Sequence, residues 1–221
     1  QLGDHSVTLS IARAMSLALE YFTTGNQEYI VAAIENLNIA LELAHDFESP
    51  SQWWVARLLR LMINGNRDAS LWSILPPYFP GDRSILERYS RLLAFGKYSI
   101  TELWRSQREA IPVVMDRARS GAVVSMRTSS GKTRIAELAI LQTVHDDPTA
   151  KILYLAPFRS LALEIEQSLG EIFDWCGFHV SHLYGGFRMS SADRKLVEES
   201  SITIATPEKA RAILRASPEL F

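Results

Sequence analysis

The sequence predicts an α/β protein in two parts: an all-helical N-terminal domain and a second domain built on a parallel β-sheet. Two patterns lead to this prediction. Apolar residues recur at three- and four-residue spacing through residues 5–95, which is typical of amphipathic helices. From about residue 98, short apolar runs alternate with helical patterns, as in parallel sheets joined by right-handed crossovers. We therefore expect one domain over residues 1–97 and another over residues 98–221.

The helical half divides at its turn residues. Helices are predicted over 5–22, 28–47, 49–65 and 83–95, separated by turns such as Thr-Thr-Gly-Asn and Pro-Pro-Tyr-Phe-Pro-Gly-Asp. Trp53 and Trp54 begin the apolar face of the third helix. We expect both indoles to be buried, in a core or against the second domain.

The second half alternates between two kinds of pattern. Strands are predicted over 122–126, 151–157, 178–184 and 201–206, and helices over 100–119, 131–145, 159–176, 191–199 and 207–216. Ligands of such sheets bind beyond the carboxyl ends of the strands.

The segment Arg-Thr-Ser-Ser-Gly-Lys-Thr, residues 127–133, lies between a predicted strand and a predicted helix. Small residues let backbone N–H groups face an anion, and the helix start adds its positive dipole end. Lys132 would reach the β- and γ-phosphates of a nucleotide, and the Thr133 hydroxyl would ligand Mg²⁺. Met126 stands where this type of loop usually begins with glycine. A solvated turn is the alternative, but the flanking strand and helix favour a triphosphate site.

The composition limits the classes of protein and of site that the chain can represent. The 23 basic and 25 acidic residues give a net charge of −2, so no overall basic field points to nucleic acid, although a groove can be locally basic. The single Cys176 excludes an internal disulfide, and the five histidines lack metal-ligand spacing. The sequence shows no membrane span and no signal segment, which predicts a cytoplasmic protein without membrane contact. Because the chain starts at Gln1 instead of Met, we expect it to be a piece of a longer protein.

Several turns of the second half, taken together, resemble the motifs of superfamily 2 helicases of the DEAD/DEAH-box class, particularly the Ski-like and Lhr-like branches. RTSSGKT resembles motif I, with Met126 and Arg127 in place of the usual Ala-Pro. YLAPFRSLALE is similar to motif Ia, LYGG to a glycine doublet, and IATPEKA to motif Ib. Gln107, in LWRSQREAI, stands where these proteins carry a glutamine that recognises adenine.

The resemblance implies a partial RecA-like domain that binds ATP, Mg²⁺ and single-stranded DNA or RNA. The implied cofactor-binding residues are Gln107, Arg127, Thr128, Ser129, Ser130, Gly131, Lys132, Thr133 and Arg134, with Lys132 and Thr133 catalytic and Thr133 the metal ligand. The implied nucleic-acid-binding residues are Pro157, Arg159, Gly185, Gly186, Thr206 and Lys209. A glutamine amide can donate to and accept from adenine at once. Guanidinium, backbone N–H and hydroxyl groups can hold phosphates without reading the base sequence.

Helicases of this class also need an acidic motif that holds Mg²⁺ and a second motor domain that supplies arginine fingers. After Pro207 the sequence contains only EKARAILRASPELF, which has no aspartate and no strand-like run. We therefore expect the front part of an ATP-dependent helicase, truncated before the acidic motif and inactive by itself. The alternative is a non-catalytic nucleotide-binding module whose N-terminal helices bind a protein partner.

Overall fold

The structure is a computed structural model, and it describes residues 2–97, 99–183, 185 and 188–221. The chain forms two compact units, Gln1–Lys132 and Thr133–Phe221, here called the N-terminal and C-terminal units. The domain boundary predicted between residues 97 and 98 stays a prediction. An all-helical region followed by a small parallel sheet confirms the predicted α/β class and a partial RecA-like fold.

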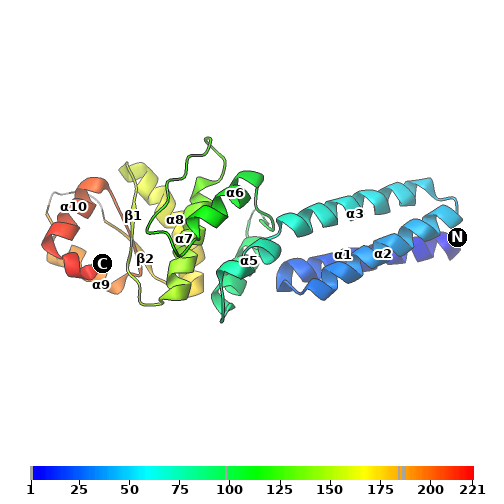
Figure 1. Cartoon of the computed structure of the whole chain (residues 1–221), viewed down its shortest axis with the longest axis horizontal. Coiled ribbons are helices and arrows are strands. Elements are labelled where there is room, and N and C mark those ends of the chain that lie inside the picture. The colour runs from blue at the N-terminus through cyan, green and yellow to red at the C-terminus, as the bar shows by residue number, and fades with distance from the viewer. Residues whose placement is uncertain (1, 98, 184, 186–187) are drawn as a thin grey trace. The chain divides into compact units, whose positions relative to one another are not determined.

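Three long helices make up most of the N-terminal unit: α1 (Leu2–Thr24), α2 (Gln27–Asp46) and α3 (Pro50–Ala69). In Figure 1 α1 and α2 run side by side, and α3 packs along α2. Alanines at the shared face allow the close approach, and larger side chains complete the core. Its buried members are Val7, Ala14, Ala18, Tyr21, Ile30, Ala33, Leu37, Ala40, Ala44, Ala56 and Ile63. The predicted helices 5–22 and 28–47 are thus confirmed, and the third is confirmed except for its end: it continues past the predicted stop at residue 65 to Ala69.

The two tryptophans of α3 do not share one environment. Trp53 is half-buried against the core, with the Arg57 guanidinium 5.1 Å from its ring centroid. Trp54 is 56% exposed, so the prediction that both indoles are buried was wrong for Trp54. Adjacent helical residues point about 100° apart, and only one of them can face a given core. The outer side of α3 is nonetheless apolar, and its exposed residues include Trp54, Val55, Leu58, Leu61 and Met62.

Shorter elements complete the N-terminal unit: α4 (Leu71–Ile74), η1 (Pro76–Tyr78), α5 (Ser84–Phe95) and α6 (Arg105–Val114). Helix α6 is shorter than the predicted helix 100–119. The backbone before it is bound elsewhere, because the Ile100 N–H donates to the Leu93 carbonyl (2.8 Å) and the Leu103 N–H to the Ala69 carbonyl (2.8 Å). Those hydrogen bonds hold residues 100–103 outside the helix.

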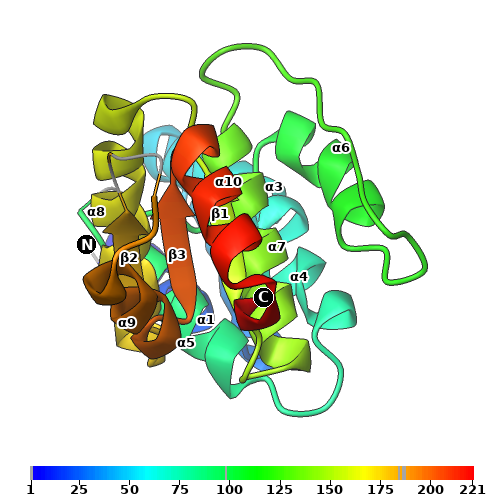
Figure 2. The same ribbon diagram turned by 90° about the vertical axis from the view of Figure 1, so that its left-hand side faces the viewer.

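The strand predicted over residues 122–126 is absent, which corrects the sequence prediction. Residues 121–127 have no regular secondary structure, and Val123 is 98% exposed. An apolar run becomes a strand only where another strand satisfies its backbone groups. The described residues provide no such partner for this segment. It therefore runs as an extended connection from α6 toward the loop at 127–131 (Figure 2).

The C-terminal unit contains a three-stranded parallel sheet in the order β1-β3-β2. Along the chain, α7 (Lys132–Asp146), β1 (Ile152–Leu155), α8 (Arg159–Cys176), β2 (Val180–Leu183), α9 (Ser191–Glu199), β3 (Ile202–Ala205), α10 (Pro207–Ala216) and η2 (Pro218–Leu220) follow one another. Leu155 and Leu183 are both in register with Ala205, so all three strands end at the same edge. The other three predicted strands and all four predicted helices after residue 130 are confirmed.

Helices cover both faces of this sheet (Figure 2). On one face His182 of β2 forms an ion pair with Glu166 of α8. On the other face Leu183 and Ala205 pack with Val197 of α9 and Ile213 of α10. All four residues of β3 are buried, as expected for a central strand. No helix in the described part of the chain is long and apolar enough to cross a membrane.

Candidate nucleotide and nucleic-acid sites

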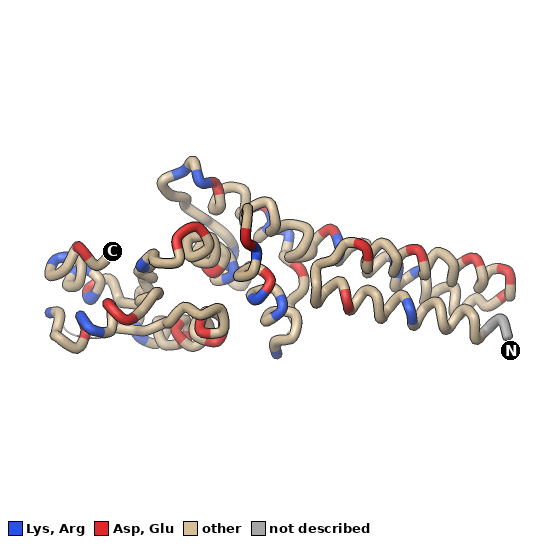
Figure 3. Tube along the Cα trace, turned by 90° about the horizontal axis from the view of Figure 1, so that it is seen from below, with Lys and Arg blue, Asp and Glu red and all other residues tan. Residues whose placement is uncertain are grey.

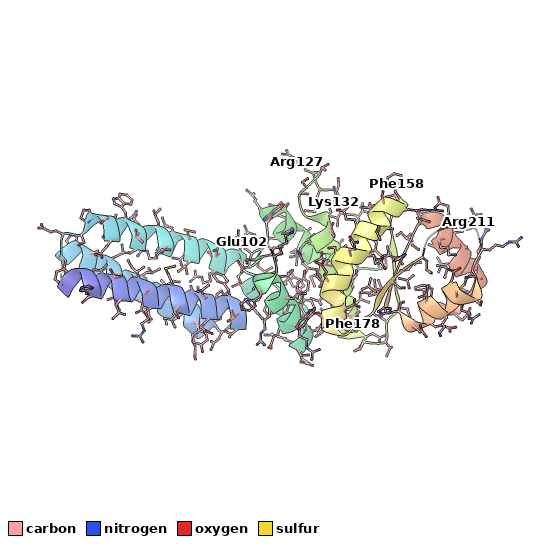
Figure 4. The ribbon with its side chains drawn as sticks, turned by 180° about the vertical axis from the view of Figure 1, so that it is seen from behind. Glu102, Arg127, Lys132, Phe158, Phe178 and Arg211 are labelled. Carbon is pink, nitrogen blue, oxygen red and sulfur yellow. The ribbon has the colours of Figure 1, made fainter. Side chains whose placement is uncertain are left out.

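The loop at residues 127–131 turns sharply before α7. Ser129 and Gly131 have φ values of 60° and 80°, in the left-handed region. The Ser130 N–H donates to the Arg127 carbonyl (3.3 Å), which closes the turn. Thr128 and Ser129 are exposed, as is Arg127, which projects from the loop in Figure 4. The loop therefore presents backbone and small side chains to solvent, as a phosphate-binding turn requires.

Lys132 holds this loop from its C-terminal side. Its ammonium donates to the carbonyls of Met126 (2.9 Å) and Arg127 (3.4 Å), and the side chain is exposed. Both acceptors are neutral carbonyls instead of carboxylates, so the charge of Lys132 is not neutralised. A phosphate in the loop would offer the ammonium a stronger, charge-assisted partner.

Gln107 connects α6 to the loop. The side chain is 7% exposed; its Oε1 accepts from the Trp104 N–H (2.8 Å) and its Nε2 donates to the Gly131 carbonyl (3.4 Å). Nearby, the Ser106 hydroxyl donates to the Ser130 carbonyl (3.4 Å). The structure therefore brings the predicted adenine-recognising residue and the predicted phosphate loop together.

Gly131 is required at its position for two reasons. Its φ of 80° is one that side chains rarely adopt, and a Cβ built on it would overlap the Gln107 amide. Beside this contact lies a hollow of about 500 Å³ between α6 and residues 123–130. Its walls are partly apolar, and they are formed by Ser106, Glu109, Ala110, Val113, Val123, Val124, Ser125, Met126, Arg127 and Ser130. A hollow of this kind beside a phosphate loop fits a base and sugar.

Thr133 and Arg134 lie in the first turn of α7. Thr133 is exposed and its hydroxyl can reach a ligand. The Arg134 guanidinium instead forms an ion pair with Glu137, a carboxylate that is only 2% exposed. Burial, and secondarily the charge of Glu137, raises the pKa of Tyr154 on β1. The side chain of Arg134 is thus engaged inside the C-terminal unit, and its cofactor contact stays a prediction.

Four of the predicted nucleic-acid-binding residues follow the carboxyl ends of the three strands. Pro157 and Arg159 follow β1, Gly185 follows β2, and Thr206 follows β3. A Cβ built on Gly185, whose φ is 72°, would lie 3.4 Å from Nη2 of Arg159, so the first two turns adjoin. Thr206 occupies the N-cap position of α10 without a side-chain cap bond, and it is 8% exposed. Gly186 lies outside the described residues.

Lys209, a predicted nucleic-acid-binding residue, is buried and paired in this structure. Its ammonium is 4% exposed and donates to Asp193 Oδ2 (2.7 Å) and to the Arg188 carbonyl (3.0 Å). Burial alone would raise the pKa of Asp193, but hydrogen bonds from Lys209 and Ser190 outweigh burial and lower it. The ammonium thus links the Arg188 carbonyl and Asp193 to α10, and the nucleic-acid contact of Lys209 stays a prediction.

The sequence interpretation missed the partners of these two cations, the buried Glu137 and the partly exposed Asp193. Glu137 lies three residues after Arg134, a spacing that places both on one helix face and could have indicated the pair. Asp193 and Lys209 are on different helices, so no local spacing indicates them. In the described part of the chain, no group of three or more His, Cys, Asp or Glu residues forms a metal site.

A glycine-dependent loop with a lysine and a threonine at the start of a helix, in a chain whose next elements form a parallel sheet, defines a P-loop nucleotide-binding protein. The sequence model of the DEAD/DEAH box helicase family matches residues 104–220, more than half of the chain. The chain belongs to this family, and it is an N-terminal portion of a superfamily 2 helicase.

Curated relatives support the same assignment. The chain is 37% identical to the Hachiman protein HamB of Bacillus cereus over 210 residues, which are 95% of this chain and 19% of that protein. It is 32% identical to the ATP-dependent DNA helicase MER3 of Saccharomyces cerevisiae (52% of this chain, 10% of that protein). It is 35% identical to the ATP-dependent RNA helicase DExH12 of Arabidopsis thaliana (46% and 5%). The chain thus spans about a fifth or less of these relatives.

Proposed function

We propose that these residues form the ATP-binding front part of a nucleic-acid-dependent ATPase of the helicase type. One observation carries the proposal: the buried Gln107 amide contacts the Gly131 carbonyl of the loop, and among the described residues Lys132 donates to two neutral carbonyls of the same loop. An adenine-reading amide and a phosphate-reading ammonium thus converge on one loop.

The donor set fits ATP. The backbone of residues 127–131 and the ammonium of Lys132 would hold the phosphates, and the Gln107 amide would select adenine over guanine. The Thr133 hydroxyl would bind Mg²⁺, which when bound neutralises charge that develops on the transferred phosphoryl group. The chain's own part in this is to position the triphosphate and to exclude other bases.

Single-stranded DNA or RNA is the second proposed ligand. Arg159, the backbone N–H groups at Gly185 and Gly186, and Thr206 would contact successive phosphates at the carboxyl edge of the sheet. Such contacts do not discriminate bases. The named relatives include both a DNA and an RNA helicase, so we propose single-stranded nucleic acid without choosing the sugar.

We also propose that residues 1–221 alone do not turn over ATP. The sequence after Pro207 contains no aspartate, whereas phosphoryl transfer in this class needs an acidic motif and an arginine finger. The missing arginine alone costs about a thousandfold or more in rate.

Calorimetry tests this function directly. The chain should bind ATP weakly, and Lys132→Ala should abolish binding. Lys195→Ala, which also removes one exposed lysine charge but on α9, is the control. Gln107→Ala should reduce the preference for ATP over GTP, with exposed Gln167→Ala as its control. Equal binding by wild type and Lys132→Ala, or Lys132-dependent turnover by residues 1–221, would contradict the proposal.

The second candidate is a non-catalytic nucleotide-binding module whose helices bind a protein. The exposed apolar row of α3, which includes Trp54, Leu58 and Met62, favours it. The ATPase activity of the longer parent protein, with and without single-stranded nucleic acid, separates the two candidates. A motor is stimulated by the strand, and a non-catalytic module shows no turnover.

A further inference from the structure

The cations of the C-terminal unit fall into two groups. Most are engaged: Arg134 with Glu137, Lys151 with the carbonyls of Glu198 and Ser200, Arg194 with Glu198 and Glu219, Lys195 with Glu199, and Lys209 with Asp193. In contrast, the guanidinium groups of Arg159, Arg188, Arg211 and Arg215 form no hydrogen bond or ion pair with another described residue. An unpaired arginine keeps its full charge for a ligand.

The unpaired arginines are not scattered. Arg159 begins α8 directly after β1, Arg188 follows β2, and Arg211 lies in the second turn of α10 after β3. Because the strands are parallel and end in register, these positions share the carboxyl edge of the sheet. Arg211 and Arg215 also border a hollow of about 450 Å³ along the exposed side of α10. Figure 3 shows the basic positions on this last helix, near the C-terminal end.

The buried pair described above fixes this arrangement. Lys209 belongs to α10, and its ammonium binds both the Arg188 carbonyl and Asp193 of α9. The turn that carries Arg188 is therefore tied to the helix that carries Arg211.

Among the described residues of this edge, an exposed aromatic side chain accompanies the arginines. Phe158 lies between Pro157 and Arg159, at the N-cap position of α8, and it is 68% exposed. Figure 4 shows Phe158 at the end of α8 nearer the start of α10, and Phe178 at the opposite end. Trp175, at that opposite end of α8, is 74% exposed and has no comparable set of unpaired arginines beside it in the sequence.

We propose that Phe158 stacks on a base of the bound single strand, while Arg188 and Arg211 add phosphate contacts to those of the motif residues. Every base has an aromatic face, so stacking adds affinity without adding sequence preference. A charged edge interleaved with an aromatic ring is the usual construction of a single-strand site. The proposal rests on the proposed function, because it concerns the same ligand.

The test measures anisotropy of a short fluorescein-labelled oligothymidylate at low salt, beside an abasic oligomer with the same number of phosphates. Phe158→Ala should weaken oligothymidylate binding roughly five- to hundredfold and leave abasic binding unchanged. Phe158→Tyr should bind oligothymidylate about as tightly as wild type, because tyrosine keeps an aromatic ring, and so should Trp175→Ala. Arg188→Ala and Arg211→Ala should each weaken both oligomers and lower the salt dependence by about one phosphate contact. Lys195→Ala, whose ammonium is already paired, is the control for the arginines.

The outcomes separate the two proposals. If wild type binds and Arg159→Ala weakens binding, but Phe158→Ala behaves like Trp175→Ala, the stacking inference is overturned and the proposed function stands. Equal losses for both oligomers in Phe158→Ala would likewise overturn stacking. If wild type binds neither oligomer, both proposals fail.

Discussion

Replacing Gly131 by alanine tests whether the contact between Gln107 and the phosphate loop matters for function. The new Cβ would overlap the Gln107 amide, and the backbone at this position has a φ of 80°. Gly81 offers a matched control in the same unit. It also has a φ of 80°, but a Cβ there would meet nothing within 4 Å. The two substitutions share the backbone strain and differ only in the crowding.

The structure gives the size of that difference. Alanine in the left-handed region costs about 1–2 kcal/mol in both variants. In Gly131→Ala the Gln107 side chain must also swing away, because the end of a flexible side chain moves more easily than a backbone. It then loses its hydrogen bonds with the Gly131 carbonyl and the Trp104 N–H, each worth about 1 kcal/mol. We therefore expect Gly131→Ala to be destabilised by about 1–2 kcal/mol more than Gly81→Ala.

Urea unfolding followed by circular dichroism measures the stability difference, and calorimetry with ATP and GTP measures the consequence for binding. Gly131→Ala should lose the preference for adenine, because the displaced amide no longer faces the loop. Gly81→Ala should keep that preference. Equal destabilisation of the two variants, together with an unchanged ATP/GTP ratio in Gly131→Ala, would refute this reasoning.

Two further predictions concern the ion pair of Lys209 and Asp193 in the C-terminal unit. Lys209→Met should lower the free energy of unfolding by about 1.5–3 kcal/mol, since it removes the charge-assisted hydrogen bond to the partly exposed Asp193, whereas the exposed Lys195→Met should change it little. A loss below about 1 kcal/mol in urea unfolding would contradict the pairing. The lowered pKa of Asp193 means that its contribution is complete above the ordinary aspartate pKa, near 4, and is lost as pH falls through the lowered value. Wild type should therefore have a higher free energy of unfolding than Asp193→Asn at neutral pH, and the difference should narrow only below about pH 4. A difference that stays constant with pH down to acid unfolding would refute this prediction.

Local patterns were sufficient for most of the fold. The three long helices have regular apolar spacing, and the strands at 152–155, 180–183 and 202–205 are short runs with apolar residues that pair with one another. The run at 122–126 has the same composition, yet it forms no strand. Strand formation depends on a partner from elsewhere in the chain, which composition does not encode.

The residues of the candidate sites also fall into two groups: those indicated by the local sequence and those whose contacts depend on distant parts of the chain. Lys132, Thr133 and Gln107 could be proposed from the sequence, because the roles predicted for them depend on residue type and position along the chain. The burial of Lys209 and the engagement of Arg134 depend on partners that only the folded chain supplies. Sequence patterns placed these cations on the correct helices, but they did not indicate which of them form ion pairs with carboxylates.

The strand order has a consequence for how the chain folds during synthesis. β1 and β2 each pair with β3, and β3 is the last of the three to be made. The fifty residues between Leu155 and Ala205 take roughly 3 to 10 seconds at about 5–20 residues per second. During that interval β1 and β2 have no strand partner in this sheet. Helix α8, which packs on β2 and is complete before it, can cover Val180 while β3 is awaited. The helical hairpin of α1 and α2, built from local contacts, folds without such a delay.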